Sequence, residues 1–376
     1  MANSNKRNYT LDIVKGIAII LMVGGHAEFP IRHFIYLFHM AIFFMVSGFF
    51  FQSKYSDSVK NIWEFIKKRL KGLWLPYVVC NIIFSLLHNF FIKINFYTNN
   101  TDIFKYVSKE YVKIVNPWSL TETIKNILQS AFLYKWTGNY LLGAIWFLET
   151  LFKISILFCL IDFIIKKIFK IKKTVYVQLI LSVIFLAAGF WCHLKSFDFY
   201  GTGLNKVFSY YILFYMGYFV ATHNISEILT KSNMKYLYLG ISFAVLIVMN
   251  QLGTIDLIDN IYPNPAFLII CSVSGWIFIY VIADLIGKLK HFKNVLVCLG
   301  QNTLFILVLH YTCFKIVSYI GVLVDGKPKY CVAAFPILYD KGVWWIAYMI
   351  VGITIPILIA AIWNKIKPRS KTTLAS

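Results

Sequence analysis

Charged residues are scarce in this chain. Asp, Glu, Lys and Arg together make up 14% of its 376 residues, whereas 59% are hydrophobic and the mean hydropathy is +0.68. A soluble domain carries about 25% charged residues. The chain therefore lacks the polar residues that would cover a soluble surface, and its composition predicts a polytopic membrane protein.

Acidic residues are rarer still, with 16 Asp and Glu against 37 Lys and Arg, and the formal charge is +21. The basic residues lie mostly in short clusters between apolar segments, as expected of cytoplasmic loops. No basic face or aromatic-basic module accompanies this charge, so nucleic-acid binding is not expected.

Several chemical motifs are missing. The seven cysteines are odd in number and form no C-x-x-C pair, so neither a disulfide framework nor a metal site is indicated. There is no Walker A or G-x-G-x-x-G loop and no G-x-S-x-G elbow, which leaves nucleotide hydrolysis and serine hydrolysis without support. The N-terminal MANSNKRNYT leads into the first apolar segment without a cleavage motif, so that segment is expected to be retained.

What the chain does have is a series of apolar segments. A helix needs about 20 mostly apolar residues to cross about 30 Å of hydrocarbon. The sequence predicts an all-α protein with about ten transmembrane helices and both termini cytoplasmic; the spans cover 11–27, 33–52, 73–93, 141–165, 175–193, 206–222, 236–252, 265–286, 295–320 and 343–364. With ten spans all the basic clusters fall on one side, which is the cytoplasmic side by the positive-inside rule; they lie at Lys6–Arg7, 54–71, 166–173, 288–293 and 364–371.

The segment 94–140 lies on the opposite side and is expected to be an external loop. After Pro117 it carries Ser119 and Glu122 in the spacing of a capping box, which predicts a helix. That helix is expected to be amphipathic and to lie along the outer surface. The segment 321–342 is the other sizeable external piece.

The first span contains three ionisable residues. At 100° per residue, Asp12, Lys15 and His26 share one helical face, and such residues usually face a bundle interior. Asp12 and Lys15 are equally well explained as an i, i+3 ion pair at the cytoplasmic end. His26 lies about 16 Å further along the helix, behind Gly24 and Gly25, which allow close approach. Because neutral imidazole accepts a proton near pH 7, His26 is the strongest candidate for a general base.

Other polar residues within the spans have two open interpretations. Glu149, in GAIWFLETLF, needs a partner such as a His or Lys on another span. His39 and His310 are either functional or satisfied core residues, and together with Trp146 they are the candidates for contacting the substrate. Arg32 and His33 fall in a turn and are expected to be solvated, and Ser47–Gly48 is expected to form a close helix contact.

The cytoplasmic cluster KKRLKG (67–72) precedes LWLPY directly. Basic residues beside a membrane normally signal topology or contact anionic lipid. The alternative is an anion site, in which Arg69 grips phosphates bidentately while Lys68 and Lys71 act as point charges.

Five blocks together resemble the integral-membrane acyltransferase-3 family, with a closer likeness to its polysaccharide O-acetyltransferase, fucose 4-O-acetylase-like branch. They are LDIVKGIAIILMVGGH, FIYLFHMAIFFMVSGFFF, FIKKRLKGLWLPY, AIWFLETLF and LGQNTLFILVLH, and the resemblance covers most of the chain, most densely 9–80. It implies about ten spans in the plasma (inner) membrane. It also implies transfer of an acyl group, usually acetyl from cytoplasmic acetyl-CoA, to a sugar hydroxyl of a surface glycan or its lipid-linked precursor.

The resemblance carries over to particular residues. His26 matches the family's essential first-span histidine, Lys15 matches the basic residue eleven positions before it, and Arg69 matches the first arginine of an R-x-x-R pattern. The second arginine is replaced by Gly72, so Lys68 or Lys71 must substitute or the donor contact differs. A fused extracellular hydrolase-like domain, present in some members, is absent here, so the acceptor would bind to the membrane helices and to the loops 94–140 and 321–342.

The expected mechanism places the phosphates of acetyl-CoA near Arg69, Lys68 and Lys71, with the pantetheine arm reaching inwards along the face of Lys15. His26 would deprotonate the acceptor hydroxyl or take the acyl group covalently, and Glu149 or Asp12 would orient or charge-balance the site. A transporter or flippase for a glycan or lipid precursor is the alternative class, although related halves and paired broken helices are lacking. An O-succinyltransferase of the same family is a further alternative. The acceptor and the oligomeric state are not determined by the sequence.

Overall fold

The computed structural model describes residues 9–133, 137–171, 174–197, 203–231 and 233–366. Within these ranges the long elements are all helices, and extended backbone pairs only at two isolated bridges, Thr98 with Ile114 and Asp256 with Ile261. The chain is thus an all-α polytopic membrane protein. Lys6, Arg7 and the ends of two basic clusters, 172–173 and 367–371, lie outside the described residues.

Helices occupy the positions of all ten predicted spans. In chain order they are α1 (Tyr9–His26), α2 (Arg32–Tyr36), α3 (His39–Phe49), α4 (Val59–Arg69), α5 (Leu75–Leu86), α6 (His88–Lys93), α7 (Leu120–Phe132), α8 (Trp146–Lys167), α9 (Thr174–Leu194), α10 (Leu204–Thr222), α11 (Ile225–Lys231), α12 (Lys235–Leu252), α13 (Pro265–Ile286), α14 (Lys290–Gln301), α15 (Thr303–Asp325) and α16 (Trp344–Ile366).

Among the described residues, seven segments have the length and apolarity of a membrane span. They are α1, the segment Arg32–Phe49, α9, α12, α13, α15 and α16. The helices at 73–93, 141–165 and 206–222 are shorter or richer in charged and tyrosine residues. The total of ten spans, and the cytoplasmic placement of both termini, therefore stay predictions.

The second predicted span is interrupted after Tyr36. Phe38 leaves the helical conformation, with φ −146° and ψ −20°. Its side chain packs on Gly275 of α13, where a Cβ would lie only 2.2 Å from the Cβ of Phe38. The interruption brings the rings of Tyr36 and His39, on either side of it, to a centroid distance of 5.1 Å.

The ninth predicted span has different boundaries from those expected. Instead of one helix over 295–320, α14 and α15 meet at Asn302, and the apolar span runs over Thr303–Asp325. The side chain of Asn302 donates to the carbonyl of Cys298 (2.8 Å), a local bond by which Asn competes with helix continuation. This frees α14 to pack on α1, where a Cβ on Gly300 would lie 1.9 Å from the carbonyl oxygen of Asp12.

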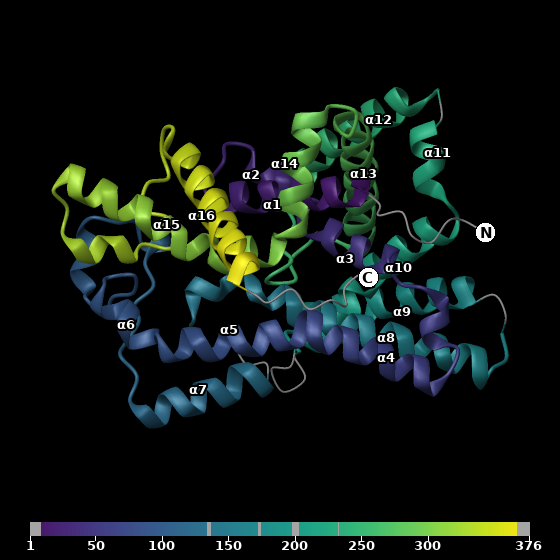
Figure 1. Cartoon of the computed structure of the whole chain (residues 1–376), viewed down its shortest axis with the longest axis horizontal. Coiled ribbons are helices and arrows are strands. Elements are labelled where there is room, and N and C mark those ends of the chain that lie inside the picture. The colour runs from purple at the N-terminus through teal and green to yellow at the C-terminus, as the bar shows by residue number, and fades with distance from the viewer. Residues whose placement is uncertain (1–8, 134–136, 172–173, 198–202, 232, 367–376) are drawn as a thin grey trace.

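The helix α10 is surrounded by α3, α8 and α9 (Figure 1). Its contact with α3 is a reciprocal glycine crossing. A Cβ on Gly48 would lie 1.9 Å from the carbonyl oxygen of Phe214, and one on Gly217 would lie 1.8 Å from that of Met45. Glycines at such crossings let membrane helices approach closely, so the close contact predicted for Ser47–Gly48 is confirmed.

A single helical path leads from α4 through a π-helical turn, Leu70–Trp74, into α5. The helix α7 runs alongside α5 (Figure 1), and its predicted capping box between Ser119 and Glu122 is present. The hydroxyl of Tyr77 on α5 donates to the carbonyl of Ser130 on α7 (2.8 Å). The amphipathic helix of segment 94–140 therefore follows α5 along its length.

Candidate active site

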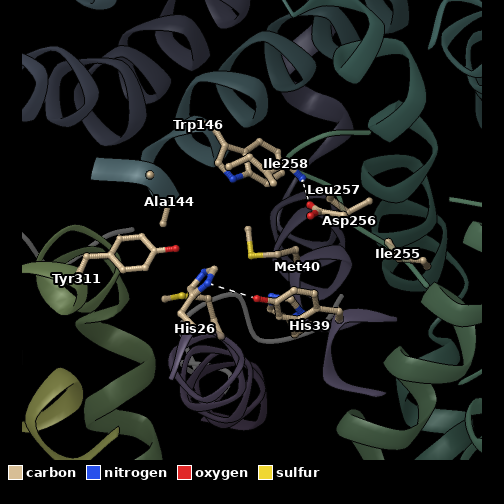
Figure 2. A pocket seen from close by; sticks show the side chains of 13 residues that line it. His26, His39, Met40, Ala144, Trp146, Ile255, Asp256, Leu257, Ile258 and Tyr311 are labelled. Atoms are coloured by element: carbon tan, nitrogen blue, oxygen red, sulfur yellow. Dashed lines mark hydrogen bonds between the residues drawn. The ribbon is translucent and has the colours of Figure 1, made fainter. Parts of the chain in front are cut away.

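His26 is the last residue of α1 and borders a cavity with a volume of about 70 Å³. The walls come from α1, α2, α3, the start of α8 with the 3-10 turn before it (Tyr140–Ile145), the loop between α12 and α13, and α15 (Figure 2). The lining residues are Met22, His26, Tyr36, His39, Met40, Gly143, Ala144, Trp146, Ile255, Asp256, Leu257, Ile258 and Tyr311.

Four residues that the sequence singled out meet here. His26, His39 and Trp146 line the cavity, and the buried His310 stacks on His26 with 5.4 Å between ring centroids. Tyr311, which the sequence reasoning missed, lies 4.9 Å from the His26 ring, and Figure 2 shows its hydroxyl pointing towards the space between His26 and Ala144. The structure therefore gathers four separate sequence segments around one imidazole.

Backbone carbonyls hold two of the three imidazoles in one tautomer. The Nδ1 of His39 lies 3.0 Å from the carbonyl oxygen of Ile35, and the Nδ1 of His310 lies 2.9 Å from that of Ile306. Because a carbonyl oxygen can only accept, each Nδ1 carries the proton in the neutral ring, and each Nε2 keeps a lone pair. The Nε2 of His310 is buried and has no hydrogen-bond partner among the described residues.

Tyr36 extends this arrangement to His26. Its hydroxyl lies 3.3 Å from the carbonyl oxygen of Gly25 and 3.4 Å from the Nδ1 of His26. If the single hydroxyl proton goes to the carbonyl, His26 donates from Nδ1 to Tyr36, and its Nε2 is left as the base. Gly25 makes room for this, since a Cβ there would lie 2.4 Å from the Cε1 of Tyr36. The close approach predicted for the paired glycines is thus made at Gly25 by an aromatic ring.

Asp12 and Lys15 lie at the other end of α1 and do not line the cavity. The ammonium of Lys15 and the carboxylate of Asp12 are 2.8 Å apart, in the i, i+3 pair that the sequence offered as one of two interpretations. Lys15 keeps 24% of its side chain exposed, against 7% for Asp12. The Lys15 ammonium can therefore reach a ligand while staying beside its carboxylate.

Glu149 lies on α8, outside the cavity lining. It forms an ion pair with Lys153, one turn further along the same helix. The sequence had suggested a partner on another span; the structure shows a partner on α8 itself. Arg32 and His33 were expected in a turn but begin the short helix α2. Arg32 pairs with Glu28, whereas His33 is exposed as expected.

The basic residues of the segment 67–72 lie beside aromatic rings or in solvent. The guanidinium of Arg69 lies 5.0 Å from the ring centroid of Phe65, the Lys68 ammonium lies 5.3 Å from that of Tyr55, and Lys71 is exposed. Burial lowers the pKa of Arg69 to about 10, so it stays charged at neutral pH. No carboxylate within the described ranges forms an ion pair with Arg69, and a partly buried cation without one is suited to binding an anion.

The π-helical turn Leu70–Trp74 directly follows Arg69. Such turns are rare and occur frequently at functional sites. Gly72 lies in this turn, and a Cβ there would meet nothing within 4 Å. Packing therefore does not require glycine at the position where the resembled pattern has arginine.

A fully buried lysine connects the segment 321–342 to the cavity wall. Lys315 on α15 donates to the carbonyls of Ala333 (3.2 Å) and Ala334. The next residue, Phe335, packs on Tyr311 at a centroid distance of 4.7 Å. Lys315 thus holds in place the chain segment that backs Tyr311, and the sequence analysis had not singled it out.

Asp256 is another cavity residue that the sequence reasoning missed. It lies in the loop 253–264, in a stretch without any recognisable motif. Burial raises the pKa of its carboxyl, and the nearby Asp259 raises it further. For Tyr311 a signal was available, because it directly follows His310; for Asp256 there was none.

One comparison with known proteins bears on this site. A family model described as an acyltransferase domain matches residues 8–361, which is nearly the whole chain. Comparison with curated proteins and with solved structures gave no significant match.

Proposed function

Since the chain belongs to the acyltransferase-3 family, we propose that this membrane acyltransferase moves an acetyl group from cytoplasmic acetyl-CoA to a sugar hydroxyl. The acceptor is a cell-surface polysaccharide or its lipid-linked precursor, and the protein resides in the plasma (inner) membrane. The observation that carries the proposal is the position of His26 in a cavity with a hydrogen-bonded tyrosine behind its Nδ1. The family match favours acyl transfer over the transporter that shares the same intramembrane charges.

The chemistry of the cavity supports acetyl as the transferred group. The cavity is small, and Met22, Met40 and Ala144 make much of its wall apolar. None of the residues that line it is Lys or Arg, and the one acidic residue, Asp256, would repel the free carboxylate of a succinyl group. Acetyl carries no such charge.

In the proposed transfer step, the Nε2 of His26 accepts the proton of the acceptor hydroxyl. The hydroxyl oxygen forms a bond to the acetyl carbonyl carbon, the carbon–sulfur bond of the thioester breaks, and the thiolate of CoA leaves and takes up the proton. Tyr311 is placed to donate a hydrogen bond to the oxyanion that develops on the carbonyl. General-base catalysis of this kind contributes about 10²–10⁴-fold.

The donor approaches from the cytoplasmic side. Arg69, Lys68 and Lys71 bind its phosphates, and its pantetheine arm follows the face of α1 that carries Lys15. From Lys15 the thioester has about 16 Å of helix to cover before His26. Asp12 and Glu149 balance charge along this path, and His39, His310 and Trp146 contact the acceptor.

Two measurements test this function. The surface glycan of a deletion strain is compared with that of the complemented strain by mass spectrometry and NMR, and we expect one acetyl ester per repeat to be missing. Membranes supplied with radiolabelled acetyl-CoA should place the label in glycan. If the glycan of the deletion strain is acetylated as before, acetyl transfer is refuted. If the deletion strain instead stops exporting the glycan, and the membranes place no label in it, transport is favoured.

A covalent route has a distinct signature. If His26 carries the acyl group, radiolabel from acetyl-CoA should remain on the denatured protein when acceptor is withheld. Direct attack by the hydroxyl leaves the protein unlabelled. Both routes give the same glycan product.

A further inference from the structure

The loop 253–264 forms one wall of the cavity that contains His26. It connects α12 with α13, and it is tied together by two backbone hydrogen bonds of 2.8 Å between Asp256 and Ile261. The hydroxyl of Tyr210 on α10 donates to the carbonyl of Leu257 (2.7 Å) and anchors the loop to the helix bundle. Asp256 is therefore held in a fixed position on the cavity wall.

Asp256 faces the imidazole group across the cavity. Figure 2 shows His26 and Tyr311 on one side, Asp256 on the other, and Trp146 between them along the top. All four residues line the same space. The ammonium of Lys206 lies 5.6 Å from the ring centroid of Trp146, and its charge also acts on the Asp256 carboxyl.

The hydrogen bonds within the loop use only some of the acceptor positions of the Asp256 carboxylate. The Asp256 carboxylate accepts hydrogen bonds from the backbone N–H groups of Ile258 (2.9 Å) and Asp259, in the manner of an Asx turn. A carboxylate can accept about four hydrogen bonds. An asparagine would serve the turn as well, so the turn alone gives no reason for a negative charge in a largely apolar wall.

A carboxylate beside an indole ring is suited to one class of ligand. The carboxylate accepts hydrogen bonds from hydroxyl groups, and the indole covers an apolar face of the molecule that carries them. A pyranose ring offers both, because its hydroxyls project sideways from a ring with C–H groups on its faces. A simple alcohol offers only the reacting hydroxyl.

We propose that Asp256 recognises the acceptor sugar. Its carboxylate accepts a hydrogen bond from a hydroxyl next to the one that is acylated, while the sugar ring packs on Trp146 and the reacting hydroxyl faces His26. This assignment rests on the proposed function and adds a specificity-determining residue to it. The acceptor then enters from the external side, where the loop 253–264 lies, opposite to the donor.

The test uses the purified full-length protein in lipid nanodiscs with radiolabelled acetyl-CoA. The acceptor probe is the glycan and glycolipid fraction of the source cells, freed of its ester groups with mild alkali. For Asp256→Asn, which preserves the turn, we expect the apparent KM for this acceptor to rise about 10- to 100-fold, the range of a lost hydrogen bond to a charged group. The apparent KM for acetyl-CoA should stay unchanged.

Asp259→Asn is the matched control. Asp259 belongs to the same loop but is exposed and does not line the cavity. Its charge raises the pKa of the Asp256 carboxyl, so its removal favours the charged form of Asp256 and should raise neither KM. If Asp256→Asn does not accumulate as folded protein, Asp256→Glu replaces it, since it keeps the charge and displaces the carboxylate by one methylene. The same rise in acceptor KM is expected.

The outcomes separate this assignment from the function on which it rests. If the unaltered protein labels no glycan, the sugar acceptor itself is refuted. If the unaltered protein labels glycan and Asp256→Asn does so with the same acceptor KM, the proposed function stands and the role of Asp256 is overturned. Equal rises for Asp256→Asn and Asp259→Asn would also overturn it, because they would indicate a general effect of loop charge.

Discussion

The two ends of α1 hold their polar groups in different ways. At the end that carries His26, backbone carbonyls bind the side chains of Tyr36, His39 and His310. Each of these rings therefore has a fixed orientation around His26. At the other end of α1, and around Arg69 on α4, long cationic side chains lie over aromatic rings or beside a single carboxylate.

This difference matches the two tasks of an acyltransferase. Proton transfer needs a lone pair held in one direction within a few tenths of an ångström, which short hydrogen-bonded rings provide. Binding the phosphates of the proposed acetyl-CoA donor would need positive charge that can adjust its position, which long Lys and Arg side chains provide. The chain thus separates a rigid half around His26 from an adaptable half around Lys15 and Arg69.

The largest effect is expected from removing the fixed lone pair. His26→Ala leaves the hydroxyl proton without a base, and we expect the transfer rate to fall about 10²–10⁴-fold. The measurement is incorporation of radiolabelled acetyl into glycan by membranes that contain equal amounts of the protein. His33→Ala, at an exposed position on α2 nearby, is the control and should retain full activity. A His26→Ala protein that still acetylates the glycan normally would remove the rigid half from the mechanism.

In the adaptable half, Arg69→Ala should weaken binding of the proposed donor and leave kcat unchanged. A lost charge-assisted hydrogen bond corresponds to about 10- to 100-fold in the KM for acetyl-CoA. Because the pKa of Arg69 is about 10, this contribution should be constant from pH 6 to pH 8 and should be lost as the pH rises through 10. Lys67→Ala, whose ammonium lies over Trp63 on the same helix, is the control. An effect of Arg69→Ala on kcat alone would contradict the division.

Features that depend on interactions between residues close in the sequence could be predicted, whereas features that depend on contacts between distant segments could not. The helical segments could be predicted, because hydropathy is a local property of the chain. His26 became the candidate base for a similar reason, as an imidazole within an apolar span. The ends of the ninth span could not be predicted, since the break at Asn302 depends on a local side-chain bond and on the packing of α14 against α1.

The cavity illustrates the same limit. His26, Tyr36, Asp256 and Tyr311 come from four segments separated by up to 285 positions, and only the packed helices bring them together. Tyr36 and Asp256 are ordinary residues in their own segments, at the end of a short helix and in a loop. A pattern within one segment of the sequence does not show which distant segments pack against it. For this reason the sequence did not predict that Tyr36 and Asp256 line the cavity.

Tyr36→Phe tests whether the rigid half depends on tautomer as well as position. The variant keeps the ring packed on Gly25 and removes only the hydroxyl that lies 3.4 Å from the Nδ1 of His26. A neutral hydrogen bond is worth about 0.5–1.5 kcal/mol, so kcat should fall about 2- to 12-fold. The pH dependence of kcat should shift as well, which a purely structural effect would not produce. Tyr319→Phe, at an exposed position on α15, serves as the control, and an unchanged pH profile for Tyr36→Phe would refute the tautomer argument.

The smallest expected effect tests whether an added positive charge in the adaptable half strengthens binding of the proposed donor. Gly72→Arg introduces a second arginine one turn after Arg69, in the π-helical turn where an added Cβ meets no neighbour within 4 Å. If donor phosphates bind beside this turn, the added charge should lower the KM for acetyl-CoA about 2- to 5-fold, in line with about 0.5–1 kcal/mol for a solvent-exposed ion pair. Because an exposed pair is screened by salt, the gain should shrink as ionic strength rises. Gly72→Gln adds comparable bulk without charge and should leave the KM unchanged. If both variants raise the KM, the phosphates do not lie beside Gly72, and the contact of Arg69 with the donor would have to be on the opposite side of the helix, towards Phe65.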